Sequence, residues 1–371
     1  MSSLPHYQDL PNNSVVCLMS PTASGKTDLA FRLYQTGRFE LVSVDSALIY
    51  QGMNIGTAKP TADELAQFPH HLVDIISPTK TYSVANFVAD VERLIHEIHQ
   101  RGKIPLLVGG TMMYYMALFD GISSVPETDQ SVRDKVKAWL DEEGNDAIYQ
   151  YLMKHDPVIC EKLKPTDTQR ITRAVEVHLQ TGVPMSTWQA TPKVALSHDP
   201  KWQWYGIVVT PDRAWLHERI ERRLEIMWAD GFVDEVVGLL NKYPALTADM
   251  PSMRCVGYRQ VLEYLAVTAH PAIVNHSGLA TFAQQILNND MQKIHDASKT
   301  DKKSQKNLIN ADEVSCKDMK NKALYATRQL AKRQYTWLKQ LALMENPTIK
   351  HISIASFDSI KQVQTHFLQL Q

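Results

Sequence analysis

The segment SPTASGKT, Ser20–Thr27, constrains the fold of this chain more than any other feature. It follows a short apolar run at Val15–Met19 and precedes a stretch with helical apolar spacing that ends at Gly37. A turn between a strand and a helix gathers backbone N–H groups and the positive end of the helix dipole toward one anion. Lys26 adds a point charge there, and the Thr27 hydroxyl can ligate Mg²⁺. The segment therefore predicts a phosphate-binding loop.

One position departs from the usual phosphate-loop pattern, because Ser20 stands where a glycine is expected. If that position needed a positive φ, serine would cost roughly 1 to 2 kcal/mol relative to glycine. We expect phosphate binding to survive this change. The alternative interpretation is a Gly-Lys-Thr turn that only links a strand to a helix.

Short apolar runs alternate with helical patterns along much of the chain. Four further strands and one helix are predicted, with the strands at Glu40–Val44, Leu72–Ile76, Ile104–Val108 and Tyr205–Thr210 and the helix at Val84–Arg101. Such alternation is typical of a parallel sheet with helices on both faces. We therefore predict an α/β fold: a P-loop NTPase-like parallel sheet covered by helices, with an inserted all-helical subdomain.

The predicted domain boundaries follow changes in pattern. Residues 1–125 form the first part of the α/β domain, residues 126–200 the helical insertion, and residues 201–265 the return to the α/β domain. Residues 266–321 are polar and mixed in charge, with KTDKKSQKN at their centre, and we predict a flexible insertion there. Residues 322–371 form a C-terminal basic helix and a tail.

Composition limits the class of protein. The chain has 39 Lys and Arg residues against 40 Asp and Glu residues, a net charge of −1, so any RNA site must be local. Its four cysteines show no metal-ligand spacing, its start lacks an apolar signal core, and no apolar run approaches the ~20 residues of a membrane helix. We expect a cytoplasmic monomer with no membrane partner.

Asp45 closes the second predicted strand, in VDSALIY. Its carboxylate should lie at the carboxyl edge of the sheet, where open parallel sheets bind ligands. There it could hold Mg²⁺ through water or act as a general base, or it could simply cap the following turn. Gly109–Thr111 follows the fourth strand and brings a turn and a hydroxyl to the same edge.

Three basic clusters are candidates for a polyanion site. They are QRITR at Gln169–Arg173, RCVGYR at Arg254–Arg259, where Tyr258 is a possible stacking surface, and the segment Lys320–Lys339, which has no acidic residue. At 100° per residue, the last segment carries Arg328, Lys332, Tyr335 and Lys339 on one face, and Leu330, Trp337 and Leu341 on the other. Such a helix could pack on one side and hold a phosphodiester backbone on the other, although a solvated charged face is the usual explanation.

The long helix predicted after the last strand adds more arginines. Arg219 and Arg223 are one turn apart, and a forked guanidinium suits a pair of diphosphate oxygens. Surface ion pairs with Glu218 and Glu225 are an equally good explanation.

Several segments together resemble the tRNA dimethylallyltransferase family. They are, in chain order, SPTASGKT, VDSALIYQGMNIGTAKP, HHLVDIISP, LLVGGTMMYY, QRITRAVEV, PSMRCVGYRQ and ATRQLAKRQYTWL. The match covers most of Val15 to Leu265 and resumes near Ala323. It implies a Mg²⁺-dependent transfer of a dimethylallyl group from dimethylallyl diphosphate to the exocyclic amino nitrogen of the adenine 3′ of a tRNA anticodon. The stretch between Tyr258 and Ala326 is longer than the family's usual connection.

The resemblance also implies residue roles. It makes Asp45 the base, with Lys26 and Thr22 also catalytic, and Thr27 the metal ligand. The diphosphate ligands would be Ser20, Pro21, Thr22, Ala23, Ser24, Gly25, Lys26 and Thr27, together with Arg223. The tRNA contacts would be Asp45, Ser46, Ala47, Leu48, Thr111, Arg133, Gln169, Arg170, Ile171, Thr172, Arg173, Arg254, Cys255, Val256, Gly257, Tyr258, Arg259, Lys332, Arg333 and Tyr335. The helical insertion and the anticodon stem-loop of tRNA would then be partners.

Two other functions remain open from the sequence alone. A small-molecule kinase would use the loop and Asp45 but has no use for three basic clusters. A nucleotide-gated RNA-binding protein would use the clusters but leaves Asp45 without a role. Transfer of label from dimethylallyl diphosphate into tRNA distinguishes both from a transferase.

Overall fold

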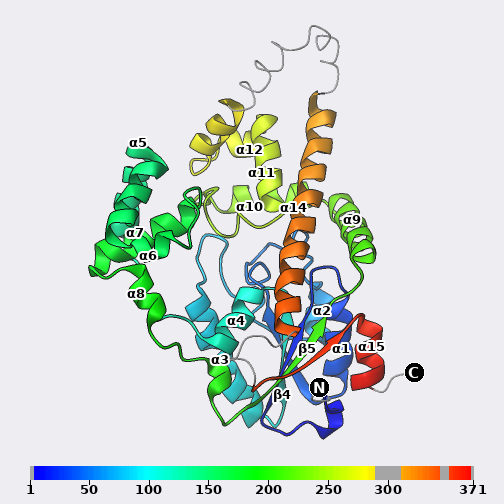
Figure 1. The fold of residues 1–371 in the computed structure, drawn as a ribbon. Coiled ribbons are helices and arrows are strands. Elements are labelled where there is room, and N and C mark those ends of the chain that lie inside the picture. Colours follow the sequence, from blue (N-terminus) through cyan, green and yellow to red (C-terminus); the bar gives the residue numbers. More distant parts are fainter. Residues whose placement is uncertain (1–3, 289–310, 343–350, 369–371) are drawn as a thin grey trace. The chain divides into compact units, whose positions relative to one another are not determined.

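The computed structural model describes residues 4–288, 311–342 and 351–368. These residues form two compact units, Met1–Leu118 with Asp199–Gln371 and, separately, Phe119–His198. The first unit contains the sheet and the second is helical (Figure 1). The predicted helical insertion at 126–200 differs from the second unit by seven residues at its start and two at its end.

A parallel sheet forms the centre of the first unit. Its strands are β1 (Ser14–Met19), β2 (Phe39–Val44), β3 (His70–His71), β4 (Ile104–Gly109), β5 (Gln203–Val209) and β6 (Ser353–Phe357). Within the described residues their order is β3-β2-β4-β1-β5-β6, and every neighbouring pair is parallel. The prediction of a parallel sheet covered by helices is confirmed.

Two details of the strand prediction are wrong. Leu72–Ile76 is not a strand, because Leu72 and Asp74 have φ values of 64° and 55°, which extended backbone does not allow. Only Ile76 pairs, in an isolated bridge with Tyr50. The strands β3 and β6 were not predicted, since β3 has only two residues and nothing in the sequence of β6 shows that it pairs with β5.

The register brings three chain turns to one edge of the sheet. Met19 at the end of β1 pairs with Gly109 at the end of β4, and Gly109 pairs in turn with Val44 at the end of β2. The residues that follow these strands are therefore neighbours. This edge carries the start of the phosphate loop, Asp45 and the Gly109–Thr111 turn, as a parallel sheet with a ligand site at its carboxyl ends requires.

The helices of the first unit cover the sheet and extend beyond it. They are α1 (Lys26–Gln35), α2 (Ala62–Gln67), α3 (Val84–Gln100), α4 (Met112–Asp120), α9 (Arg213–Ala229), α10 (Phe232–Lys242), α11 (Tyr258–Val267), α12 (Pro271–Val274), α14 (Ala311–Ala342) and α15 (Ile360–Phe367). Leu33 of α1 and Phe367 of α15 pack in one core with Val16, Leu18 and Leu106 of the strands. Helices α1 and α15 therefore cover the same face.

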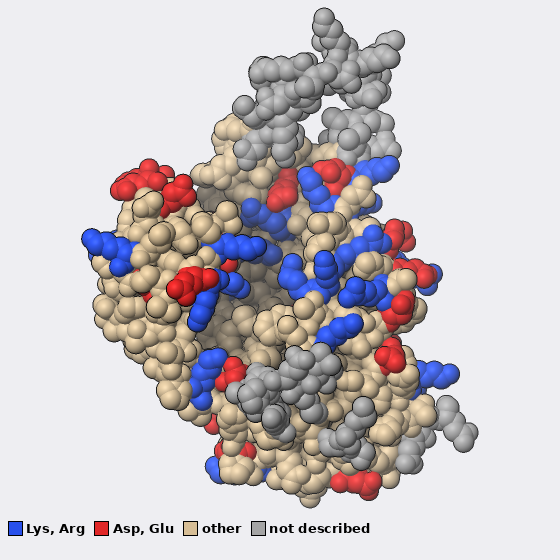
Figure 2. Space-filling model, in the orientation of Figure 1, with Lys and Arg blue, Asp and Glu red and all other residues tan. Residues whose placement is uncertain are grey.

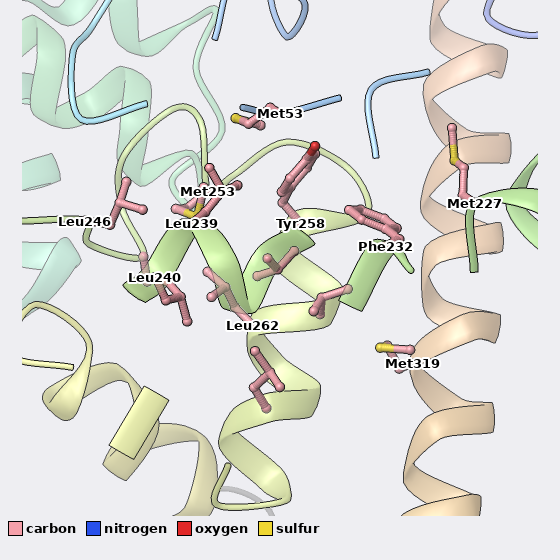
Figure 3. Close-up of a cluster of buried hydrophobic side chains, with 14 of the residues drawn as sticks. Met53, Met227, Phe232, Leu239, Leu240, Leu246, Met253, Tyr258, Leu262 and Met319 are labelled. Carbon is pink, nitrogen blue, oxygen red and sulfur yellow. The ribbon is translucent and has the colours of Figure 1, made fainter. Parts of the chain in front are cut away.

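A second core joins the helices that follow β5. It holds Tyr258 and Leu262 of α11, Phe232 of α10, Met227 of α9 and Met319 of α14, as Figure 3 shows. Figure 1 shows α14 as one long helix beside α9 and α11. This core fixes α14 against the body that carries the phosphate loop.

Helix α14 begins at Ala311, eleven residues before the predicted start at 322. Its buried positions follow a spacing of three and four residues along one face: Met319, Ala323, Thr327, Ala331, Gln334, Leu338 and Leu341. The predicted packing face was therefore partly wrong. Leu341 is buried as expected, but Trp337 is 44% exposed.

The predicted flexible insertion at 266–321 does not fit the residues described in that range. Helix α12 and a helical segment at 280–288 follow α11, and Ile273, Leu279 and Ala283 are buried in the second core. The centre of the predicted insertion, 289–310, lies outside the described residues.

The second unit has its own core. Its helices are α5 (Gln130–His155), α6 (Pro157–Cys160), α7 (Thr168–Thr181) and α8 (Met185–Ala190). Val136, Ile148, Leu152, Ile171 and Val175 form the centre of that core. Gly144 has a φ of 82° inside α5, so the chain bends there.

In the described parts of the chain, no helix is both long and apolar enough to span a bilayer.

Candidate active site

The phosphate loop leads directly into helix α1. Gly25 is the N-cap of α1 with a φ of 90°, and Ala23 is also left-handed with a φ of 63°. Gly25 has no side chain to cap the helix, so the first N–H groups of α1 stay available for an anion. Ser20 does not have a positive φ, and its buried hydroxyl donates to the Val209 carbonyl at 3.0 Å. The strain that a positive φ would cause at Ser20 is therefore absent.

Lys26 is a half-buried cation in this loop. Its Nζ donates to the Pro21 carbonyl at 3.4 Å. Burial lowers the pKa of Lys26 to about 8, the charge of Asp45 opposes this shift, and the charge of Arg223 adds to it. A bound anion would stabilise the protonated form. The loop is thus built for an anion rather than for an internal ion pair.

Thr22 is held by two side chains from distant helices. Its N–H donates to Gln334 Oε1 at 3.0 Å, and its Oγ1 accepts a bond from Arg223 Nη2 at 2.6 Å. Arg219, one turn earlier on α9, donates through Nε to the Ala23 carbonyl at 2.8 Å. Both arginines of the predicted pair therefore contact the loop.

Arg223 is the more deeply placed of the two. Burial lowers its pKa to about 10, and the nearby charge of Asp45 limits that shift. Its Nε is buried and has no hydrogen-bond partner among the described residues. A buried guanidinium with an unused donor is an incomplete arrangement that a bound anion would complete.

Asp45 turns its carboxylate back onto the following turn. Oδ1 accepts from the N–H of Ala47 at 2.9 Å and of Leu48 at 3.4 Å. Asp45 therefore caps this turn. The two bonds to Oδ1 fix the carboxylate, and Oδ2 takes part in neither of them. Beside it, Thr111 Oγ1 accepts from the Ser46 N–H at 3.1 Å.

One cavity of about 470 Å³ within the first unit is lined by some of these groups, and Thr22 is the residue of Ser20–Thr27 among its lining residues. Of the residues predicted as functional, it is lined by Thr22, Asp45, Ser46, Ala47, Thr111, Arg223, Arg254, Cys255, Val256, Gly257 and Arg333. Burial, and then the charge of Asp45, raises the pKa of Cys255 to about 12, so this thiol is neutral. The cavity therefore pairs one carboxylate with several cationic groups.

The comparisons with known proteins agree with this geometry. The family model for IPP transferase matches residues 48–341. The chain belongs to the IPP transferase family. It is 56% identical over 366 residues to the tRNA dimethylallyltransferase of Psychrobacter sp. (strain PRwf-1), covering 96% of this chain and 95% of that protein. It is 46% identical over 328 residues to the tRNA dimethylallyltransferase of Acinetobacter baumannii (strain SDF), covering 88% and 90%.

Two solved structures have a similar fold. The full-length tRNA isopentenylpyrophosphate transferase from Bacillus halodurans is 26% identical with a TM-score of 0.55, covering 96% of this chain and 95% of that one. A eukaryotic dimethylallyltransferase acting on tRNA has a TM-score of 0.67 at 23% identity, with 96% and 77% covered, which shows a shared fold. The resemblance seen in the motifs is confirmed.

Several predicted contacts in the first unit lie outside the cavity, among them Tyr258, Arg259 and Leu48. Tyr258 is buried, packs edge-on against Phe232 and donates to Glu235 Oε1 at 2.5 Å, so the prediction of a stacking surface there is wrong. Arg259 donates to the Ala248 carbonyl and to Glu263, both at 3.1 Å. Leu48 is half-buried behind the Asp45 turn and does not line the cavity.

The basic helix presents two different surfaces. Arg333 lines the cavity, together with Leu330 and Trp337. Lys332 and Tyr335 line a separate groove of about 220 Å³ with Arg213 and Arg328, and the Arg213 guanidinium lies 5.0 Å from the Tyr335 ring centre. Figure 2 shows Lys and Arg side chains gathered over α9 and α14. The local basic surface expected from the sequence is present.

Among the contacts predicted in the second unit, some side chains are exposed and others are buried. Arg133 and Arg170 are exposed, and Arg170 lies 3.4 Å from Asp167. Gln169 is exposed as well, and Thr172 donates back to the Thr168 carbonyl. Arg173 donates to Thr128 Oγ1 and to the Pro126 carbonyl, which ties α7 to the segment before α5. Ile171 is fully buried in the core of this unit, so its side chain cannot be a tRNA contact.

Two residues that shape the site were not predicted. Glu235 accepts from the N–H groups of Asn54, Ile55 and Gly56 at 2.6 to 3.1 Å and from Tyr258, and so holds the loop whose Gly56 and Thr57 line the cavity. Its acidic position in the first turn of α10 was visible in the sequence, but its partners were not. Gln334 was not singled out, because only the basic residues of this segment were considered as candidates.

Proposed function

We propose that this chain transfers a dimethylallyl group from dimethylallyl diphosphate to the exocyclic amino nitrogen of the adenine 3′ of the anticodon in tRNA, releasing diphosphate. Membership of the IPP transferase family and 56% identity to a tRNA dimethylallyltransferase support this reaction. One structural observation carries it furthest. A single cavity brings the Asp45 carboxylate together with Thr22 of the phosphate loop and Arg223 of α9.

In the proposed reaction, a bond forms between the adenine amino nitrogen and the first carbon of the dimethylallyl group. The bond from that carbon to the diphosphate oxygen breaks, and its electron pair leaves with diphosphate. The amino nitrogen gives up a proton. Catalysis therefore requires stabilisation of a departing anion on one side and a proton acceptor on the other.

The phosphate loop supplies the first requirement. The N–H groups at the start of α1, the Lys26 ammonium and the Arg223 guanidinium would surround the diphosphate. Both cations have lowered pKa values because they are buried. Their charges are poorly compensated in the free protein and would be compensated most fully as negative charge collects on the leaving group.

The residues of the site fit a Mg²⁺ ion held mainly by substrate. Among the described residues, no group of three or more His, Cys, Asp or Glu side chains could hold a metal. Mg²⁺ often takes only one or two protein oxygens and completes its shell with phosphates and water. The Thr27 hydroxyl, exposed in the first turn of α1, would be one ligand, and the ion would neutralise diphosphate charge.

Asp45 would be the general base. Its Oδ1 is fixed by two backbone N–H groups, so the carboxylate has one orientation, and Oδ2 is the oxygen that can accept the amino proton. The nucleobase would have to leave the stack of the anticodon loop to reach it. Apolar side chains such as Met113 and Leu330 line the same cavity and would exclude water from the reacting carbon.

The proposed tRNA contacts include residues of both units. Arg254 and Arg333 line the cavity and would bind phosphates next to the extruded base. Exposed Arg133, Gln169 and Arg170 of the helical unit would contact the anticodon stem-loop. A monomeric enzyme acting in the cytoplasm completes the proposal, and size-exclusion chromatography with light scattering tests the monomer.

A direct experiment tests the function. The protein is incubated with Mg²⁺, labelled dimethylallyl diphosphate and unmodified tRNA, and digested RNA is analysed for prenylated adenosine. Label on the adenine 3′ of the anticodon is expected. Turnover of ATP on a metabolite without label transfer would support a kinase instead, and tRNA binding without any transfer would support a binding protein.

A further inference from the structure

Gln334 joins two turns of the site from a helix that is 312 residues from one turn and 224 from the other in sequence. Its Oε1 accepts from the Thr22 N–H at 3.0 Å, and its Nε2 donates to the Gly110 carbonyl at 2.9 Å. The side chain is only 9% exposed, whereas its neighbour Arg333 on α14 is exposed. One buried amide therefore satisfies a donor on the phosphate loop and an acceptor on the turn after β4.

This arrangement uses both ends of the amide in fixed directions. Buried backbone groups without partners are costly, so Thr22 and Gly110 keep their positions only while the amide is present. Gly110 leaves room for it, because a Cβ there would lie 2.5 Å from Gln334 Nε2. With the Arg223 bond to its Oγ1, Thr22 is then fixed at both its main chain and its side chain.

The same helix carries residues that face the cavity. Gln334 itself lines the cavity, as do Arg333 before it and Trp337 about one turn later. A displacement of α14 would therefore move a cavity-lining cation and the Thr22 anchor together. The contact links the proposed nucleic-acid side of the cavity to the diphosphate side through one residue.

We propose that Gln334 is a positioning residue, which sets the geometry of the diphosphate loop through Thr22 and transmits the position of α14 to it. This inference rests on the proposed transferase function. Gln334 lines the cavity beside Thr22, and its proposed role is exerted through the bond to Thr22. Its loss should impair use of the diphosphate while leaving tRNA affinity nearly unchanged.

The test is Gln334→Met, which keeps the length of the side chain and removes both hydrogen bonds. The kcat/KM for dimethylallyl diphosphate is expected to fall roughly tenfold or more, the equivalent of about 1.4 kcal/mol. The dissociation constant for tRNA, measured without diphosphate, should change less than about twofold. Gln340→Met is the matched control, because Gln340 is exposed on the same helix.

A second variant reaches the same contact from the other side. Gly110→Ala places a methyl group against the amide and should reproduce the loss in Gln334→Met. If both act through one contact, the double variant should be no worse than the more impaired single variant, since the contact can be lost only once. This variant also answers the case in which Gln334→Met fails to fold.

The outcomes separate the two proposals. If the wild-type protein transfers no label, the proposed function fails regardless of Gln334. If the wild type is active and Gln334→Met matches it in kcat and in KM for the diphosphate, the positioning role is refuted. Equal losses of tRNA and diphosphate affinity would also refute it, because they indicate general disruption of α14.

Discussion

Replacing Arg223 with methionine should remove most of the activity without destabilising the protein. The Arg223 guanidinium is buried, it has an unpartnered Nε among the described residues, and it lies beside a second cation, Lys26. Such a charge is useful only when an anion arrives. In the free protein it is a cost, and functional sites commonly carry such costs.

The magnitude follows from the pKa of Arg223, which burial lowers from 12.5 to about 10. A lowered pKa of a cation means that the folded state disfavours the charged form by about 3 kcal/mol, since one pKa unit is about 1.4 kcal/mol. This cost is fully present at pH 7 and disappears only as the pH rises from about 10 toward 12.5. Loss of the bond to Thr22 offsets about 1.5 to 3 kcal/mol of the gain. We therefore expect the free energy of unfolding to be unchanged or higher by up to about 1.5 kcal/mol.

Activity should behave differently. Removal of one preorganised donor for a developing anion typically lowers kcat by about 10² to 10³. Label transfer from dimethylallyl diphosphate and thermal unfolding are measured side by side for Arg223→Met. The matched control is Arg222→Met on the same helix, where the side chain is 74% exposed and lies 3.7 Å from Glu218. A normal rate in Arg223→Met, or a large drop in its Tm, would refute this account of Arg223.

Three further predictions follow from other residues. The affinity for dimethylallyl diphosphate should fall about tenfold per pH unit above pH 8, where free Lys26 loses its proton, and Lys26→Met should abolish that slope; titration calorimetry across pH 7 to 9.5 measures it. Lys332 and Arg333 lie in different grooves, yet Lys332→Ala and Arg333→Ala should each reduce the steepness of log affinity for tRNA against log salt concentration by about 0.7 to 0.9. An unchanged slope would mean that the side chain contacts no phosphate. Glu235→Gln should lower the free energy of unfolding, measured in urea, by about 1 to 3 kcal/mol, because the amide nitrogen of the new glutamine would face the backbone donors of residues 54–56. An unchanged unfolding midpoint would show that the loop does not depend on this carboxylate.

The sequence predicted those parts of the site that depend on local pattern. SPTASGKT follows one parallel strand and Asp45 follows another, so their meeting at one sheet edge follows from topology alone. Arg223 was found because two arginines one turn apart suit a diphosphate. Burial of Tyr258 and Ile171 was missed, since a motif read as letters does not reveal which side chains face the core.

The remaining features depend on contacts between distant segments. Gln334 and Glu235 each bind backbone groups more than 170 residues away, and no local pattern indicates such partners. Likewise β6 joins the sheet only through pairing with β5. The packed helical residues at 271–288 were predicted to be flexible because their composition is polar, yet Ile273, Leu279 and Ala283 supply enough apolar surface to anchor them.

Conversion of Asp45 to asparagine tests the central claim most directly. Asparagine keeps the oxygen that accepts from Ala47 and Leu48, so the turn and the cavity should keep their shape, while the proton acceptor is lost. The account predicts that single-turnover transfer to tRNA falls about 10² to 10⁴-fold, with a tRNA dissociation constant within about twofold of the wild type. A near-normal rate, or a parallel loss of tRNA binding, would contradict it.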